Sequence, residues 1–307
     1  MDDTAGPVLL IVVTWNSAKN LPGLFNSLPD GMAGLDWHLI VADNDSKDAT
    51  VECVNSLMPA ATVVQTGRNA GYSAAINHAL AEIEDKFPKA RAVLVCNPDI
   101  VMQPGCGAAL VAGLEEPGTG ITAPLLYNGH GDIIRSLRRE PSVTRALGEA
   151  LLGNRRSGRY ARFGELVADP AAYKTATSAD WAAGSLLAIS RPCLDECGRW
   201  DESFFLYSEE TEYALRARDR GFATRLAPDA VATHLEGDSK VSPRLWTLLT
   251  MNRVRLYRQR HGLLATSAFW GAVLLREASR AAAGKTHSRT ATLALLRPWQ
   301  LRATPGP

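Results

Sequence analysis

The stretch Val8-Leu9-Leu10-Ile11-Val12-Val13-Thr14 decides the fold. It is a continuous run of β-favouring apolar residues, typical of a strand that is buried on both faces. Residues 18–28 then place leucine and phenylalanine at helical spacing, and the same order of strand and helix recurs along the chain (38–42, 50–57, 62–65, 73–83 and 92–96). This alternation predicts an α/β fold, with a mostly parallel sheet between two layers of helices.

Length, composition and charge limit the class of protein. The 307 residues, 46% of them hydrophobic, can bury the core of one large domain or of one domain with a helical extension. A formal net charge of +1 supplies no basic field for nucleic acid, so we expect no nucleic-acid partner. The apolar run 8–13 is too short for a signal peptide or a membrane span, which predicts a cytoplasmic protein.

The cysteines give no sign of a metal site or of a disulfide framework. They form an odd set without paired metal-ligand spacing: Cys53, Cys96, Cys106, Cys193 and Cys197. We interpret them as buried free thiols.

The second half of the chain is less regular at first. An arginine-rich stretch, 135–162, precedes a strand at 185–189, an aromatic turn at 204–207, a helix at 209–220 and a strand at 230–234. Two further helices, 243–260 and 266–283, mix apolar and basic residues. The sequence therefore predicts a C-terminal helical extension.

Polar loops follow the first four predicted strands, where an α/β sheet binds its ligands. They are residues 14–16, 43–46, 68–72 and 97–99. Asp43 and Asn44 have side chains that can hydrogen-bond a ribose or a base. Ser46 and Asp48 have a second reading as the N-cap and first-turn acid of the next helix.

The segment Asn97-Pro98-Asp99 ends a buried strand and is a candidate metal site. It would place a carboxylate where a diphosphate-bound Mg²⁺ or Mn²⁺ would lie. The alternative is an Asx turn that ends the strand. His234 also ends a predicted strand and has two readings, as a further metal ligand or as a structural histidine.

Two other segments are candidate binding loops. Arg68 and Asn69 precede Gly71 at the mouth of a helix, where backbone N–H groups can approach phosphates, although Walker and G-x-G-x-x-G sequences are absent. Trp181 stands before Gly184 and Ser185, either as a platform for a sugar or acceptor or as a tryptophan packed on the sheet.

Acidic residues begin the helix predicted at 209–220. Acids at a helix start are stabilised by the exposed backbone N–H groups, which explains some of them without any catalytic role. If this helix start faces a cleft, Glu209 or Glu210 can instead take the proton from an acceptor hydroxyl.

Together these motifs resemble the family 2 glycosyltransferases, especially the rhamnosyltransferase-like branch. The resemblance spans about residues 8–262 and rests on the order of seven segments: TWNS (14–17), ADNDS (42–46), TGRNAGY (66–72), CNPD (96–99), WAAGS (181–185), FFLYSEETEYALRARDRG (204–221) and PDAVATH (228–234). The resemblance implies a GT-A (Rossmann-like, nucleotide-diphospho-sugar transferase) fold, an inverting mechanism and a divalent cation, Mg²⁺ or Mn²⁺.

The resemblance also implies roles for individual residues. Asp99 becomes the metal-binding carboxylate of the Asp-x-Asp position, and His234 approaches the metal and diphosphate. Glu210 matches the general base, with Glu209 beside it. The residues that would line the nucleotide are Thr14, Trp15, Asn16, Asp43, Asn44, Arg68, Asn69, Gly71, Asn97 and Asp99. Those that would contact the sugar or acceptor are Trp181, Gly184, Ser185 and Glu209.

Two departures from the family pattern affect these roles. Asn97 replaces the first acid of Asp-x-Asp, which leaves one fewer charge for the cation and implies metal binding assisted by the substrate. Glu210 replaces the usual aspartate, so the choice between Glu209 and Glu210 as the base stays open.

The implied activity is sugar transfer from dTDP-rhamnose or a UDP-sugar to a hydroxyl of a glycan, lipid-linked saccharide or small molecule. The catalytic domain would span 1–237, with a nucleotide-binding half (about 1–125) and an acceptor-binding half (about 126–237), before a helical region at 238–307. The alternatives are a sugar-nucleotide nucleotidyltransferase and a non-catalytic binding protein.

The C-terminal helices have three readings. Trp270, Leu274 and Leu275 lie in the same region as Arg253, Arg255, Arg258 and Arg260, a mixture that suits packing on the catalytic domain, a homodimer interface, or peripheral contact with the inner face of the plasma membrane.

Overall fold

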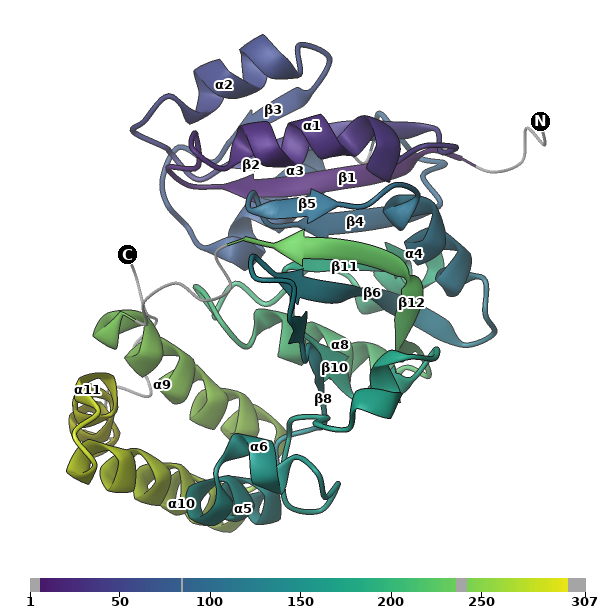
Figure 1. Cartoon of the computed structure of the whole chain (residues 1–307). Coiled ribbons are helices and arrows are strands. Elements are labelled where there is room, and N and C mark those ends of the chain that lie inside the picture. Colours follow the sequence, from purple (N-terminus) through teal and green to yellow (C-terminus); the bar gives the residue numbers. More distant parts are fainter. Residues whose placement is uncertain (1–5, 84, 236–241, 298–307) are drawn as a thin grey trace.

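A mixed β-sheet forms the centre of the chain (Figure 1). The computed structural model describes residues 6–83, 85–235 and 242–297. Within these residues the sheet has ten strands in the order β3-β2-β1-β4-β11-β6-β12-β5, with β7 beside β6 and β9 beside β12. The strands are β1 (Val8–Thr14), β2 (Trp37–Asp43), β3 (Thr62–Gln65), β4 (Ala92–Cys96), β5 (Ile100–Met102), β6 (Thr119–Asn128), β7 (Ile133–Ile134), β9 (Ser178–Ala179), β11 (Leu186–Ser190) and β12 (Ala223–His234). The short strands β8 (Leu137–Arg138) and β10 (Trp181–Ala182) pair separately.

The first four strands are parallel, as the alternation of strands and helices predicts. Their register makes the strand ends flush, since Thr14 of β1 pairs with Asp43 of β2, which in turn pairs with Gln65 of β3. Val12 of β1 pairs with Cys96 at the end of β4. The loops after these strands therefore begin at one edge of the sheet.

Antiparallel strands bring the second half of the chain to the same edge. β11 pairs with β4 so that Leu186 faces Cys96, and the residues before β11 lie beside those after β4. β12 pairs with β5 so that His234 faces Ile100. The sheet is thus mixed rather than wholly parallel.

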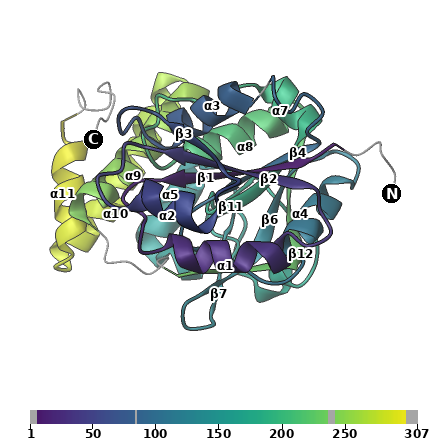
Figure 2. The ribbon, with the colours of Figure 1, turned by 90° about the horizontal axis from the view of Figure 1, so that it is seen from above.

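Helices cover both faces of the sheet (Figure 2). On one face lie α1 (Leu21–Gly31), α2 (Thr50–Leu57) and α4 (Cys106–Leu114), and on the other lie α3 (Tyr72–Ile83), α7 (Arg191–Cys197) and α8 (Glu209–Asp219). Leu24 and Leu28 of α1 are wholly buried. Each such leucine contributes roughly 1.5–3 kcal/mol of hydrophobic stabilisation.

The remaining helices form a bundle beside the sheet (Figure 1). They are α5 (Val143–Leu152), α6 (Asn154–Ser157), α9 (Pro243–Arg260), α10 (Leu263–Ala282) and α11 (Thr286–Leu295), and a 3-10 helix follows α6 at Pro170–Tyr173. The bundle buries Phe269 and Val273 of α10 against Val254 and Tyr257 of α9. Every helix in the described segments is too short or too polar to cross a membrane.

Contacts of the bundle favour the packing interpretation of the C-terminal helices. Arg253 of α9 forms ion pairs with Glu149, at 2.8 Å, and with Glu165, while Arg255 donates to the carbonyl of Ser203 at 2.9 Å. Trp270 donates to the carbonyl of Leu295 at 3.1 Å. The predicted domain boundary at 237/238 lies outside the described residues.

Some local predictions were wrong. The first helix begins at Leu21 rather than at residue 18, with Pro22 in its first turn. Ser46 does not cap α2, because its hydroxyl donates to Asp43 at 2.6 Å, and Asp48 accepts from the amide of Thr50 at 3.1 Å instead. All five cysteines are free thiols as predicted, but Cys53 is only partly buried.

Candidate active site

A cleft of about 970 Å³ runs along the carboxyl edge of the sheet, opposite one face of α9. It contains eight of the ten residues that the sequence assigned to the nucleotide: Thr14, Trp15, Asn16, Asn44, Asn69, Gly71, Asn97 and Asp99. Trp15 is 56% exposed there, which leaves its ring free to stack on a flat ligand such as a base. The converging loops predicted from the strand order therefore do meet in one cavity.

Asp43 is placed behind this cleft rather than on its lining. Its carboxylate accepts hydrogen bonds from Thr14 Oγ1 at 2.8 Å and from the hydroxyl and amide of Ser46 at 2.6 and 3.0 Å. The side chain is 1% exposed. In this structure Asp43 orders the loop that forms the cleft wall, and its contact with a nucleotide stays a prediction.

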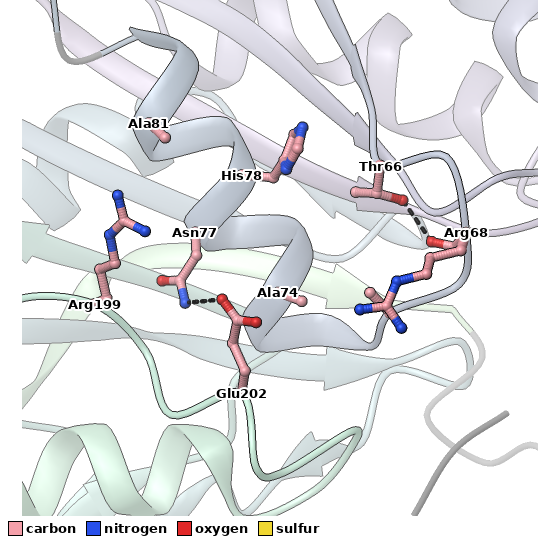
Figure 3. Close-up of a pocket in the computed structure, with 9 residues that line it drawn as sticks. Thr66, Arg68, Ala74, Asn77, His78, Ala81, Arg199 and Glu202 are labelled. Carbon is pink, nitrogen blue, oxygen red and sulfur yellow. Dashed lines mark hydrogen bonds between the residues drawn. The ribbon is translucent and has the colours of Figure 1, made fainter.

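Arg68 lies on a second, smaller pocket of about 300 Å³ beside α3. Figure 3 shows Arg68 and Arg199 on either side of this pocket, with Glu202 between them and bonded to Asn77 at 2.9 Å. The structure thus separates Arg68 from Asp99, although both were assigned to the nucleotide. Its role in donor binding stays a prediction.

Asp99 lines the cleft and pairs with His234, which is not on the cleft lining. Asp99 Oδ2 lies 3.0 Å from His234 Nε2, and the two side chains are 13% and 18% exposed. The pairing follows from the register of β12 and β5, which places His234 opposite Ile100, the residue after Asp99. The antiparallel connection therefore brings together two residues that the sequence assigned to one metal.

The pair is suited to a divalent cation. Adjacent ligands of an octahedral ion at about 2.1 Å lie about 3 Å apart, which matches the separation of these two atoms. Among the described residues there is no group of three or more His, Cys, Asp or Glu side chains that could hold a metal. Two protein ligands fit a cation whose other positions are filled by a diphosphate and water.

Glu209 and Glu210 begin α8, with Glu210 beside Gly184. A Cβ on Gly184 would lie 3.1 Å from Glu210 Cβ, so the glycine gives this side chain its room. Burial raises the pKa of Glu210, and the backbone N–H groups of the helix start and the guanidinium of Arg138 oppose that rise. Burial raises the pKa of Glu209 well above its usual range, helped by the neighbouring Glu210 charge.

The two acids differ in their surroundings. Glu209 is 4% exposed, and its Oε2 atom has no hydrogen-bond partner among the described residues. Glu210 is partly exposed. Burial raises the pKa of both acids, and the rise is opposed at Glu210 by the Arg138 guanidinium, which is not among the groups that lower the pKa of Glu209.

Tyr72 connects Asn97, two residues before Asp99, to Gly184 beside Glu210, contacts that the sequence did not reveal. Its hydroxyl lies 3.0 Å from Asn97 Oδ1 and 3.2 Å from the carbonyl oxygen of Gly184. Burial raises the pKa of Tyr72, and so do the charges of Asp99, Glu209 and Glu210. The tyrosine belongs to the TGRNAGY segment, but nothing in that segment indicates its partners.

A strained turn presents the two acids. Tyr207 and Ser208, directly before α8, both adopt left-handed backbone conformations, with φ of 68° and 75°. Asn252 of α9 is 1% exposed and donates to the carbonyls of Leu206 and Tyr207 at 2.9 and 3.1 Å. Such backbone strain persists only where neighbouring residues stabilise it, and here α9 supplies that support through Asn252.

The face of α9 is the largest part of the cleft that sequence reasoning missed. Its residues there are Arg244, Leu245, Thr247, Leu248, Met251, Asn252 and Arg255. Positions 244, 248, 251 and 255 repeat at helical spacing, which is a signal of one functional face. The spacing alone does not indicate that this face of α9 lines the cleft.

The predicted sugar or acceptor residues are not on the cleft lining, and neither is Glu210. Trp181 donates to the carbonyl of Arg139 at 3.1 Å, and the Arg138 guanidinium lies 5.8 Å from its ring centroid. Ser185 is buried, and its carbonyl accepts from Asn97 at 2.8 Å. Trp181 therefore packs as the second reading foresaw, and a role as sugar platform stays a prediction.

The chain is similar to known glycosyltransferases in sequence. The model of glycosyl transferase family 2 matches residues 9–165. N-acetylglucosaminyl-diphospho-decaprenol L-rhamnosyltransferase of Mycobacterium tuberculosis (strain ATCC 25618 / H37Rv) is 28% identical over 210 residues, which cover 66% of this chain and 67% of that protein. Low-salt glycan biosynthesis hexosyltransferase Agl10 of Haloferax volcanii is 24% identical over 210 residues, 68% of this chain and 61% of the relative.

Solved structures show the same fold at low sequence identity. The mannosyltransferase PcManGT from Pyrobaculum calidifontis, in complex with GDP-Man and Mn²⁺, aligns with a TM-score of 0.53 and 17% identity over 99% of this chain and 84% of that one. GalNAc-T7 with UDP, GalNAc and Mn²⁺ aligns with a TM-score of 0.55 and 16% identity, over 83% of this chain and 48% of that chain. The family model covers half of the chain and the fold is of the GT-A type, so this chain belongs to glycosyl transferase family 2 and is a glycosyltransferase.

Proposed function

We propose that this glycosyltransferase moves a hexosyl group, in the first place L-rhamnose from dTDP-rhamnose, to a hydroxyl of a lipid-linked saccharide with inversion at the anomeric carbon. The observation that carries this proposal is Tyr72, whose hydroxyl touches Asn97 beside the Asp99–His234 pair and Gly184 beside Glu210. A candidate diphosphate site and a candidate base are thus joined through one residue.

The donor would lie in the cleft along the sheet edge. Trp15 offers a stacking surface for the base, and Asn69 offers an amide group for hydrogen bonds. Asp99 and His234 would hold a divalent cation, and that cation, when bound, neutralises charge on the departing nucleoside diphosphate. The mycobacterial relative, named as a rhamnosyltransferase, supports rhamnose as the sugar.

Glu210 would take the proton from the acceptor hydroxyl as its oxygen attacks the anomeric carbon. A general base must be ionised at working pH, and Arg138 and the start of α8 favour that state of Glu210. Glu209, buried and without a partner at Oε2, would stay protonated and so limit the negative charge at the helix start.

We also propose a separate function for each of three regions of the chain. We propose that the half formed by about residues 1–125 binds the donor and that residues 126–237 bind the acceptor. The region 238–307 would complete the site through α9, whose residues Met251 and Asn252 line the cleft. The lipid-linked acceptor is supported by the name of the mycobacterial relative, which acts on a diphospho-decaprenol.

A donor screen tests the proposal. The purified chain is incubated with Mn²⁺, an N-acetylglucosaminyl-diphospho-prenol acceptor, and dTDP-rhamnose, UDP-glucose, UDP-N-acetylglucosamine or GDP-mannose in turn. We expect acceptor-dependent release of nucleoside diphosphate to be fastest with dTDP-rhamnose. Faster release from another donor would replace rhamnose as the sugar, and no acceptor-dependent release from any donor would contradict the acceptor class.

A further inference from the structure

Residues 151–163, here called the basic segment, expose an unusual combination of side chains at the end of the helical bundle. The large apolar side chains of Leu151, Leu152, Tyr160 and Phe163 are 74%, 48%, 60% and 43% exposed. Soluble surfaces carry single exposed apolar residues, but a cluster of them marks an interaction surface. Figure 1 places α5 and α6 next to α10, at the far end of the molecule from α2 and β3.

Arginines are interleaved with these apolar residues. Arg155, Arg156, Arg159 and Arg162 are all exposed, and none of their guanidinium groups has an ion pair or hydrogen bond with a described residue. There is no aspartate or glutamate between residues 150 and 164. The basic segment therefore has an uncompensated positive charge, although the whole chain is nearly neutral.

The basic segment is held in place by the helix before it. Arg145 of α5 donates to the carbonyl of Ala161 at 2.9 Å. Gly148 of α5 packs so closely on the segment that a Cβ there would lie 2.1 Å from the carbonyl oxygen of Phe163. Phe163 and Tyr160 are thus fixed beside the turn of α5 that carries Leu151 and Leu152, and the surface exists before any partner binds.

We propose that the basic segment docks the enzyme on an anionic lipid surface. Apolar side chains that enter the headgroup region and arginines that meet anionic headgroups are the two contributions that hold peripheral proteins on membranes. The guanidinium groups are free to pair with lipid phosphates, and they match a negatively charged partner rather than a neutral one. Of the four arginines that the sequence offered for this role, Arg258 is exposed, whereas Arg253, Arg255 and Arg260 contact residues of the predicted catalytic domain.

The chain before and after the basic segment runs beside the candidate active site. The chain leaves the site at β8, where Arg138 lies near Glu210, and returns where Leu166 forms a bridge with Arg138. A membrane under the basic segment would therefore hold the acid end of the site near lipid-linked molecules. This orientation rests on the proposed function, whereas docking itself does not.

Vesicle flotation tests the docking surface without any sugar nucleotide. The full chain is mixed with vesicles of phosphatidylcholine alone or with 30% phosphatidylglycerol, and the bound fraction is measured at low and high salt. We expect binding only to the anionic vesicles, weakened by salt, with a loss of roughly fivefold in the partition coefficient for each arginine removed. Arg155→Gln/Arg156→Gln should lose binding, while the charge-matched control Lys86→Gln/Lys89→Gln, which changes two exposed lysines elsewhere, should keep it.

Leu151→Ser is the second variant. Leu151 is 74% exposed, so we expect the substitution to leave the fold unchanged. It should weaken vesicle binding while transfer to a water-soluble acceptor analogue stays at the wild-type rate. Equal binding to neutral and anionic vesicles, or equal binding by both double variants, would overturn the proposal. Light scattering that finds a dimer in the wild type and a monomer in Leu151→Ser would also overturn it, since the surface would then be an interface between two copies.

Discussion

At the scale of single residues, Asp99 is the only acid of the Asn97-Pro98-Asp99 segment, where the family pattern has two. Asp99→Asn should keep the shape of the segment but remove the charge that holds a cation beside His234. We expect donor affinity and kcat both to fall, by more than the roughly 10–100-fold that loss of an outer partner of a metal ligand costs. The dissociation constant of the donor in Mn²⁺, measured by calorimetry, checks this.

The control for Asp99→Asn is Asp30→Asn, the same chemical change at an exposed position in α1. It should leave donor affinity unchanged. Chelator should abolish turnover by the wild type, and added Mn²⁺ should restore it. Unchanged donor affinity in Asp99→Asn, or full turnover in chelator, would remove Asp99 from the proposed metal site.

Glu209 makes stability depend on pH. Its pKa is raised in the folded state, so the folded protein retains a proton that the unfolded chain loses above its usual pKa of about 4.5. The free energy of unfolding of the wild type should therefore fall as pH rises through that window, at about 1.4 kcal/mol for each unit of pKa shift. Glu209→Gln has no titrating group at this position, so its stability should lack this dependence on pH.

Denaturant unfolding of wild type and Glu209→Gln between pH 4 and pH 8 measures this effect. The stability of the variant relative to the wild type should increase with pH. The same comparison with Glu196→Gln, an exposed acid of α7, should show no such trend. A constant difference for Glu209→Gln at all pH values would mean that Glu209 is already ionised in the folded protein.

At the scale of elements, α9 does more than pack. Asn252 donates two hydrogen bonds to the segment before Glu209, and its removal would leave the carbonyl groups of the half-buried Leu206 and Tyr207 without these donors. Asn252→Ala should lower the free energy of unfolding by about 1–3 kcal/mol. Arg258→Ala changes an exposed residue of the same helix and should have an effect within about 0.5 kcal/mol. Denaturant unfolding measures the free energy of unfolding of both variants. Equal effects would show that Asn252 of α9 does not stabilise the turn before Glu209.

Elements with a strong sequence pattern were predicted at or near their observed bounds. The helix predicted at 243–260 is α9, and the strands at 62–65 and 92–96 are β3 and β4. By contrast, α4 was missed because residues 106–114 are small or apolar on all sides and so have no polar face. β6 was missed because Pro124 argues against a central strand. The only β6 residues that pair with β11 are Ile121 and Thr122, so the proline lies beyond that ladder.

At the scale of the whole molecule, distant segments build the site. Tyr72 and Gly184 are in contact across 112 positions of sequence. Motifs predicted eight of the residues that line the cleft, because every strand of a parallel sheet ends at the same edge. They did not predict that Asp43 is enclosed or that Arg68 lies on another pocket, since a loop's path depends on contacts such as those of Thr14 and Ser46.

The central claim is that the donor cleft and Glu210 act as one site, and a paired measurement of kcat and donor affinity tests it most directly. General-base catalysis contributes about a hundred- to ten-thousandfold in rate, so Glu210→Gln should lose that much of kcat while binding the donor as the wild type does. Glu209→Gln, the neighbouring control, should lose far less. Near wild-type transfer by Glu210→Gln, together with a folded but inactive Glu209→Gln, would contradict the account and make Glu209 the base.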